Sequence, residues 1–157
     1  MEIVIIRPPL VYGTNAPGNF ARLLRLIGSG LPLPLGNLHN PRSLVALENL
    51  VSLIALCIDH PNANNQLFLV SDGEDLSTTA LIRRIAKALD KSVTLLPVPN
   101  RVLLVLASLF GKQTEVRQLS SSLRIDVSKA QQSLGWTPPL TVDEGLRLAV
   151  QGSRRAT

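Results

Sequence analysis

The chain opens with the stretch IVIIRPPLVYG at residues 3–13, and this stretch decides the fold. Four apolar residues in succession, 3–6, are typical of a β-strand covered on both faces, as in a parallel sheet. The prolines and glycine after it predict a loop. A parallel sheet needs neighbouring strands, and the rest of the sequence supplies few of them. We therefore expect that the complete protein has an N-terminal half ahead of this stretch.

Composition limits the class of protein. The 157 residues are 45% hydrophobic, enough to bury the core of one domain. Sixteen Lys and Arg exceed eleven Asp and Glu, but the basic residues are dispersed along the sequence and aromatic residues make up only 3%. Nucleic-acid binding requires clustered phosphate contacts and often stacking aromatic side chains. We expect no nucleic-acid partner.

The sequence also favours a reducing, cytoplasmic location. Cys57 lies alone in an apolar run, which favours a small buried hydrophobic residue over a nucleophile or ligand. No signal peptide is recognised, because Glu2, Arg7 and two prolines interrupt the first apolar stretch. The apolar run 44–58 is too short and too interrupted by polar residues to span a membrane.

Spacing of apolar and turn-forming residues predicts alternating strands and helices. We expect Asn19 to cap the first helix, Ser77 to cap a later one, and Thr141 with Glu144 to form a capping box. The predicted elements are strands at 3–6, 42–46, 66–70 and weakly 93–96, an extended segment at 31–36, helices at 19–28, 48–59, 77–89 and 100–110, a C-terminal helix from 141, and a frayed tail at 152–157. The helix at 48–59 is expected to be buried, and the one at 100–110, apolar nearly all round, to need a partner.

Several catalytic and binding patterns are absent from the sequence. No glycine triplet matches G-x-G-x-x-G, and Tyr12 has Ala16 where a lysine would stand on the same helix face. His39 and His60 are each alone in their segments, so no metal site is predicted. We therefore name no catalytic residue.

Several short motifs carry a family resemblance. They are RPPLVYG at 7–13, GNF at 18–20, LPLG at 33–36, RSLV at 42–45, NLV at 49–51, FLVSDGE at 68–74, DVSKA at 126–130 and LGWTP at 134–138. In order and spacing they resemble the C-terminal half of extended short-chain dehydrogenase/reductases. More narrowly, they resemble the NAD-dependent epimerase/dehydratase family, with the nucleoside-diphosphate-sugar 4-epimerases most similar.

The resemblance implies an α/β fold made of the last strands of a Rossmann-type doubly wound sheet and the smaller substrate-binding lobe. Residues 1–151 would form this portion, with 1–13 as the last parallel strand and its loop. The family abstracts hydride from a sugar carbon to NAD and returns it to the other face. NAD would require the N-terminal half, which in the family carries the Gly-rich turn and the catalytic tyrosine and lysine.

The resemblance also implies ligand contacts. The backbone around Pro9, Leu10 and Tyr12 would lie against the nicotinamide end of NAD, although an ordinary strand-ending turn explains these residues equally well. Leu10 replaces an asparagine that many sugar epimerases use to bond substrate, which leaves the sugar and the reaction type open.

A second set of residues would bind the nucleotide sugar. Asn19 and Phe20 match a helix start that contacts the diphosphate, and Leu33 and Leu35, around Pro34, match the segment lining the base. Arg42 matches an arginine that can hold a diphosphate bidentately. The rival interpretations are an N-cap, edge packing and a surface arginine. Arg117 is a further candidate, but its segment departs from the common Arg-x-Gly-Asp form.

We thus predict the substrate-binding part of a nucleotide-sugar 4-epimerase, which would be inactive on its own. Its partners would be a UDP-sugar and, through exposed apolar surface, a second copy of the chain. Two alternatives stay open. One is a non-catalytic, self-associating interaction module that buries the opening strand and the helix at 100–110. The other is a family reductase acting on a substrate that is not a nucleotide.

Overall fold

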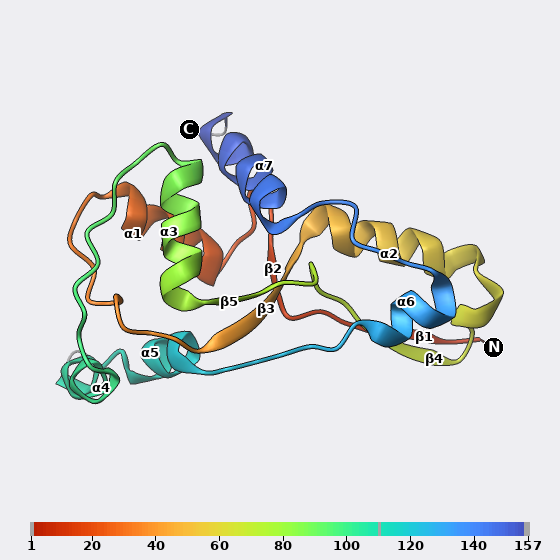
Figure 1. Ribbon diagram of the computed structural model, residues 1–157, viewed down its shortest axis with the longest axis horizontal. Coiled ribbons are helices and arrows are strands. Elements are labelled where there is room, and N and C mark those ends of the chain that lie inside the picture. The colour runs from red at the N-terminus through yellow and green to blue at the C-terminus, as the bar shows by residue number, and fades with distance from the viewer. Residues whose placement is uncertain (1, 110, 156–157) are drawn as a thin grey trace. The chain divides into compact units, whose positions relative to one another are not determined.

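Parallel strand pairing organises the computed structural model of the chain, which describes residues 2–109 and 111–155 (Figure 1). The strands are β1 (Val4–Arg7), β2 (Leu10–Tyr12), β3 (Pro41–Ala46), β4 (Gln66–Leu69) and β5 (Asp75–Ser77). The helices are α1 (Asn19–Gly28), α2 (Leu47–Asp59), the short 3₁₀ turn η1 (Pro61–Ala63), α3 (Thr78–Ala88), α4 (Asn100–Leu109), α5 (Gln113–Ser120), α6 (Ser128–Leu134) and α7 (Val142–Arg155). None of the helices in this described part has the length and apolar character needed to span a bilayer.

Contacts divide the chain into two units, each assembled from separate stretches of sequence. Unit 1 contains residues 1–16, 43–75 and 124–157, and unit 2 contains residues 17–42 and 76–123.

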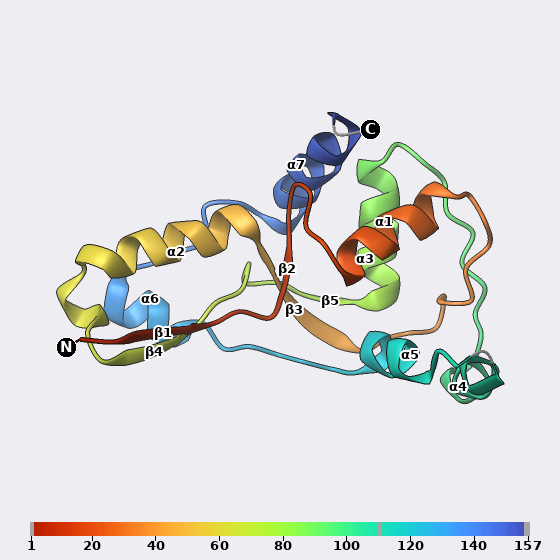
Figure 2. The same ribbon diagram turned by 180° about the vertical axis from the view of Figure 1, so that it is seen from behind.

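In unit 1, two pairs of strands run parallel. β1 pairs with β4 in the register Val4↔Gln66 to Arg7↔Leu69, and the two strands lie along each other in both views (Figure 2). β2 pairs with β3 in the register Leu10↔Leu44 to Tyr12↔Ala46, within a sheet of order β2-β3-β5. The expected loop after the first strand is therefore wrong for residues 10–12, which form a second short strand beyond the two prolines.

The opening strand is covered on one face only. Val4 and Ile6 are half-buried, whereas Ile5 is 46% exposed, and Ile3 just before the strand is 50% exposed. The period-2 alternation of a strand places these two groups on opposite faces. The expected burial of both faces is thus absent in the described chain, and the second face of β1 presents isoleucine to solvent.

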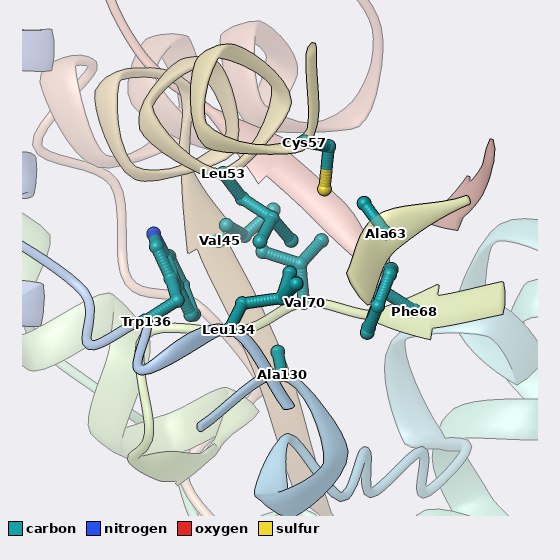
Figure 3. Packing of buried hydrophobic residues seen from close by; sticks show 9 residues of the cluster. All are labelled: Val45, Leu53, Cys57, Ala63, Phe68, Val70, Ala130, Leu134 and Trp136. Atoms are coloured by element: carbon teal, nitrogen blue, oxygen red, sulfur yellow. The ribbon is translucent and has the colours of Figure 1, made fainter. Parts of the chain in front are cut away.

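The core of unit 1 is one apolar cluster beneath α2 (Figure 3). Its members are Val45, Leu53, Cys57, Ala63, Phe68, Val70, Ala130, Leu134 and Trp136. The Trp136 indole donates a hydrogen bond to Ser52 Oγ at 2.8 Å, which satisfies its only polar group. Cys57 lies in this cluster, as expected for a buried thiol, and burial raises its pKa.

Helix α2 is only half covered, so the expectation of a buried helix is wrong. One face contributes Leu53 and Cys57 to the core. The opposite side exposes apolar side chains at a spacing of three or four residues, namely Leu47, Val51, Ile54 and Ile58.

A buried polar network ties the strands of unit 1 to the start of α7. The Tyr12 hydroxyl donates to Asp72 Oδ2 at 2.6 Å, and the Asn49 amide donates to Asp72 Oδ1 at 2.7 Å. Asn49 also exchanges two hydrogen bonds with the main chain of Leu140. Burial raises the pKa of Asp72 despite these donors, and burial followed by the Asp72 hydrogen bond raises that of Tyr12.

In unit 2, α1 and α3 pack against each other with the extended segment at 31–36 (Figure 2). The expected strand at 93–96 is reduced to a single bridge between Leu33 and Leu95. α5 was not predicted, whereas α4 was, although Phe110 at its predicted end lies outside the described residues.

The helix caps confirm two of three predictions. Ser77 Oγ accepts from the Ala80 amide at 3.0 Å, and the Glu144 carboxylate accepts from the Thr141 amide and hydroxyl, both at 2.8 Å. Asn19 as a cap is wrong, because Gly18 takes that position with φ of 81° and Asn19 is the first helical residue. The predicted frayed tail begins too early: the α7 backbone is helical to Arg155, and residues 156–157 lie outside the described chain.

Candidate functional site

Three segments of unit 2 meet at Gln118, in the last turn of α5. Asn19, at the start of α1, donates from Nδ2 to Gln118 Oε1 at 3.3 Å. Arg42, at the start of β3, donates from Nη1 to the main-chain oxygen of Gln118 at 2.6 Å. Two of the residues predicted to hold a diphosphate therefore contact the same third residue, which the sequence did not single out.

Several side chains donate hydrogen bonds to the main-chain carbonyls at the C-terminal end of α5. Asn40 donates from Nδ2 to the carbonyls of Leu119 and Ser121, both at 2.8 Å, and the Thr78 hydroxyl donates to that of Leu119 at 2.6 Å. Carbonyls at a helix C-terminus lack intrahelical partners and attract donors and cations. Part of the role of Arg42 is therefore to cap α5.

Capping leaves part of the Arg42 guanidinium unsatisfied. Its Nε atom is buried and has no hydrogen-bond partner in the described structure, and neither has the buried Asn40 Oδ1. Burial lowers the pKa of Arg42, but a guanidinium keeps its charge at neutral pH. The Arg42 residue as a whole is half-buried, so its positive charge is a suitable contact for an anion.

A small cavity lies beside this cluster. It measures about 80 Å³ and is lined by Asn19, Arg22, Leu23, Leu26 and Leu119. Asn19 belongs to both the cavity and the cluster around Gln118. Arg22 was not predicted as a site residue, although its position three residues after Asn19 places both on one face of α1.

Charge is divided unequally between the two units. Unit 2 contains ten Lys and Arg against two acidic residues, a net charge of +8, whereas unit 1 contains six against nine, a net charge of −3. The basic residues look dispersed in the sequence because unit 2 is assembled from two separated stretches. This concentration of positive charge favours an anionic ligand for unit 2.

The predicted base-lining residues Leu33 and Leu35 are part of the packing of unit 2, and so is Phe20 from the predicted diphosphate-binding helix start. All three side chains are buried, and the Leu35 carbonyl accepts from the Thr79 hydroxyl at 2.7 Å. A ligand could reach these residues mainly through their main chain. Arg117 is exposed and lies next to Gln118 on α5.

The residues predicted to face NAD lie in unit 1. Pro9 and Leu10 are half-buried beside and within β2, and Tyr12 is 1% exposed with its hydroxyl bound to Asp72. The Tyr12 side chain therefore does not fit a direct contact with a nicotinamide ring. Main-chain atoms around Pro9 and Leu10 are what this segment can offer to a cofactor.

Known proteins share both the sequence and the fold of this chain. It is 49% identical over 157 residues to UDP-glucose 4-epimerase of Vibrio cholerae, an alignment covering 99% of this chain and 48% of that protein. It is 24% identical over 162 residues to N-acetyl-α-D-glucosaminyl-diphospho-ditrans,octacis-undecaprenol 4-epimerase of Escherichia coli O157:H7, covering 96% and 49% respectively. No protein-family model matches the chain.

Among solved structures, UDP-glucuronic acid 4-epimerase from Bacillus cereus, in complex with UDP-glucuronic acid and NAD, superposes with a TM-score of 0.71. The two are 19% identical, and the match covers 99% of this chain and 46% of that one. The chain spans about half the length of the curated relatives it matches. The predicted resemblance is confirmed: homologues and structural neighbours are epimerases and dehydratases, and the α/β fold with parallel strands is that of a portion of a Rossmann-type epimerase.

Proposed function

We propose that this chain is the substrate-binding part of an NAD-dependent epimerase that acts on a sugar diphosphate. The observation that supports this most directly is the half-buried Arg42 guanidinium, which shares Gln118 as a partner with Asn19 in a unit of net charge +8. The 49% identity to an epimerase along nearly the whole chain supports the reaction class.

In this proposal the chain's own residues bind and orient the substrate. Arg42 would bind a diphosphate oxygen through the Nη donors that Gln118 does not use, and Asn19 would offer its amide close by. Fixing the diphosphate limits the sugar to rotation about its own linkage, which is the motion that an exchange of hydride between its two faces requires.

NAD would accept and return the hydride when bound, and residues outside this sequence would hold most of it. The Gly-rich turn and the tyrosine–lysine pair are not in this chain. Because Asp72 engages the Tyr12 hydroxyl, we expect the main chain near Pro9 and Leu10 to face the cofactor. We therefore expect the 157-residue chain alone to bind substrate weakly, to bind NAD poorly and to show no epimerase activity.

The names of the two relatives give substrates with different carriers. In one substrate the sugar is attached to UDP, and in the other it is attached to undecaprenyl diphosphate. Both carriers contain a diphosphate, the group that Arg42 and Asn19 would bind. The proposal therefore specifies a diphosphate in the substrate and does not specify the carrier group attached to it.

Calorimetric titration of the chain with UDP-glucose, UDP and glucose tests this function. UDP-glucose and UDP should bind and glucose should not, and Arg42→Ala should weaken UDP binding at least about tenfold, since a charge-assisted hydrogen bond contributes roughly 1.5–3 kcal/mol. Arg83→Ala, an exposed arginine on α3, is the matched control and should leave binding unchanged. Equal UDP affinity in both variants, or no binding by a folded parent chain, would contradict the proposal. A tight dimer without ligand binding would favour the interaction module.

A further inference from the structure

Helix α4 presents a stripe of aliphatic side chains to solvent. Its buried residues are Leu103 and Ala107, which face the rest of unit 2. By contrast, Val105 is 61% exposed and Leu109 is 75% exposed. These two and two further exposed side chains are spaced by three or four residues and share one face of the helix; this α4 stripe consists of Val102, Val105, Leu106 and Leu109. A contiguous apolar surface of this kind marks a site of interaction.

The position of α4 within unit 2 leaves this face open. The helix follows the long connection at 89–99 and packs against α5, which comes directly after it (Figure 1). The chain reverses at Lys112, whose amide donates to the carbonyl of Ala107 at 2.8 Å. The contact with α5 thus covers one side of α4, and the stripe lies on the other.

The charges next to the stripe are positive. Residues 91–114 contain no Asp or Glu. Arg101 lies directly before the stripe and Lys112 shortly after it, and both side chains are exposed. Unit 2 as a whole has a net charge of +8. The stripe is therefore an apolar surface with a cation at each end, in a strongly basic unit.

This charge argues against a second copy of the chain as the partner of the stripe. In the usual two-fold contact the same patch lies on both sides of the interface, so Arg101 and Lys112 of both copies would come together. Two units of net charge +8 repel each other. Self-association through this face is therefore disfavoured.

The chemistry of the stripe also fits lipid better than protein. Its members are valine and leucine, which are under-represented among the residues that dominate protein–protein binding. Hydrocarbon accepts aliphatic side chains without a specific fit, and lipid phosphates attract Lys and Arg beside them. An anionic lipid surface thus complements both the stripe and its two cations.

We propose that the α4 stripe binds an anionic lipid bilayer, with the helix lying along the membrane surface. The valines and leucines enter the boundary between headgroups and acyl chains, and Arg101 and Lys112 contact lipid phosphates. The ten residues of α4 are about 15 Å long, half of the roughly 30 Å of hydrocarbon in a bilayer, so the helix lies on the membrane and does not cross it. This binding requires neither a sugar diphosphate nor NAD and is independent of the proposed function.

Co-sedimentation of the 157-residue chain with lipid vesicles tests this proposal. The chain should bind vesicles of phosphatidylglycerol and phosphatidylcholine at least about tenfold more tightly than vesicles of phosphatidylcholine alone, and added salt should reduce this preference. Arg101→Gln combined with Lys112→Gln should reduce it as well. Leu109→Ser should weaken binding to the mixed vesicles about tenfold, because a leucine side chain no longer enters hydrocarbon.

The chain offers a closely matched control for Leu109. Ile58 lies at the end of α2 in unit 1 and is 74% exposed, against 75% for Leu109. Ile58→Ser therefore removes an equally exposed aliphatic side chain outside the stripe and should leave vesicle binding unchanged. Both positions are exposed, so both variants should keep the helical circular dichroism of the parent chain.

Each other outcome would overturn the proposal. No binding of the folded parent chain to the mixed vesicles would exclude a lipid surface as the partner. Equal weakening by Leu109→Ser and Ile58→Ser would indicate general adhesion of apolar residues, and no weakening by Leu109→Ser would mean that the stripe is not the contact. A dimer that dissociates in Leu109→Ser, with vesicle binding unchanged, would assign the stripe to a second copy. UDP binding by Leu109→Ser should equal that of the parent chain, so failure here leaves the proposed function standing.

Discussion

The guanidinium of Arg42 donates a hydrogen bond of 2.6 Å to the carbonyl of Gln118, seventy-six residues further along the chain. The same guanidinium keeps its Nε buried with no hydrogen-bond partner among the residues that the structure describes. A residue present only to stabilise the fold has no reason to leave a buried donor unsatisfied, because the lost hydration costs about 1–3 kcal/mol. We propose that Arg42 binds a ligand in addition to capping α5, and the first prediction tests the two roles separately.

The first prediction follows from that cost. Replacing Arg42 by methionine keeps much of the side-chain volume and removes both the hydrogen bond to Gln118 and the unsatisfied Nε. These effects oppose each other, so the free energy of unfolding should change by no more than about 1 kcal/mol, while UDP binding is lost. Urea unfolding measures the first quantity and calorimetry the second. A loss of several kcal/mol would show that Arg42 is chiefly a structural residue.

The second prediction concerns the Tyr12 hydroxyl. Tyr12→Phe keeps the buried ring but leaves Asp72 Oδ2 without its 2.6 Å donor, whereas Oδ1 keeps the amides of Ala46 and Asn49. Loss of a hydrogen bond to a buried carboxylate should lower the free energy of unfolding by about 2 kcal/mol. Urea unfolding at neutral pH measures it. A change below about 0.5 kcal/mol would mean that Asp72 is neutral there or finds another donor.

The third prediction uses two helical glycines with different surroundings. A Cβ at Gly145 in α7 would lie 2.7 Å from the Tyr12 hydroxyl and 3.0 Å from Ala46 Cβ, whereas one at Gly28 in α1 meets nothing nearer than 4.0 Å. Gly145→Ala should therefore destabilise the chain by roughly 1–3 kcal/mol, because the buried neighbours must move. Gly28→Ala should stabilise it by about 0.5 kcal/mol through the unfolded state. Thermal unfolding of the pair should give shifts of opposite sign.

The fourth prediction is a pH dependence at the start of α7. Hydrogen bonds from the amide and hydroxyl of Thr141 hold the pKa of Glu144 below its ordinary 4.5. Because the pKa of Glu144 is lower in the folded state, the cap contributes its full stabilisation at pH values above the pKa of the unfolded state. This stabilisation is lost as the pH falls through the pKa of the folded state. The difference in unfolding free energy between the parent chain and Glu144→Ala should thus be largest near neutral pH and shrink below pH 4.5. A difference that grows in acid would contradict this cap.

Local signals in the sequence were read correctly, and relationships between distant segments were not. The capping hydrogen bonds of Ser77 and of the pair Thr141 and Glu144 join residues three apart in the sequence, so these caps could be recognised directly. Asn19 was misassigned because the positive φ of Gly18 moves the helix start by one residue. Leu10 to Tyr12 form a strand although prolines precede them, because β3 offers a parallel partner more than thirty residues away.

The candidate site was predicted in part for the same reason. Arg42 and Asn19 came from matching motifs, but no local pattern indicates that Gln118 joins them or that the Asn49 side chain is buried. The excess charge of unit 2 was hidden because its two stretches are separated by part of unit 1. Spatial neighbours distant in sequence require the fold to be known.

The interleaving of the units has a consequence for how the chain is made. Unit 1 needs its last stretch, 124–157, to complete a core that includes Ala130, Leu134 and Trp136. During synthesis β1, β4 and α2 are made long before those residues. The side chains of Phe68 and Leu53 therefore stay exposed to solvent while unit 2 is synthesised. Folding of unit 1 therefore depends on long-range contacts and cannot be completed before residues 124–157 are available, which makes it slow, and a nascent chain halted before residue 124 should be a substrate for chaperones.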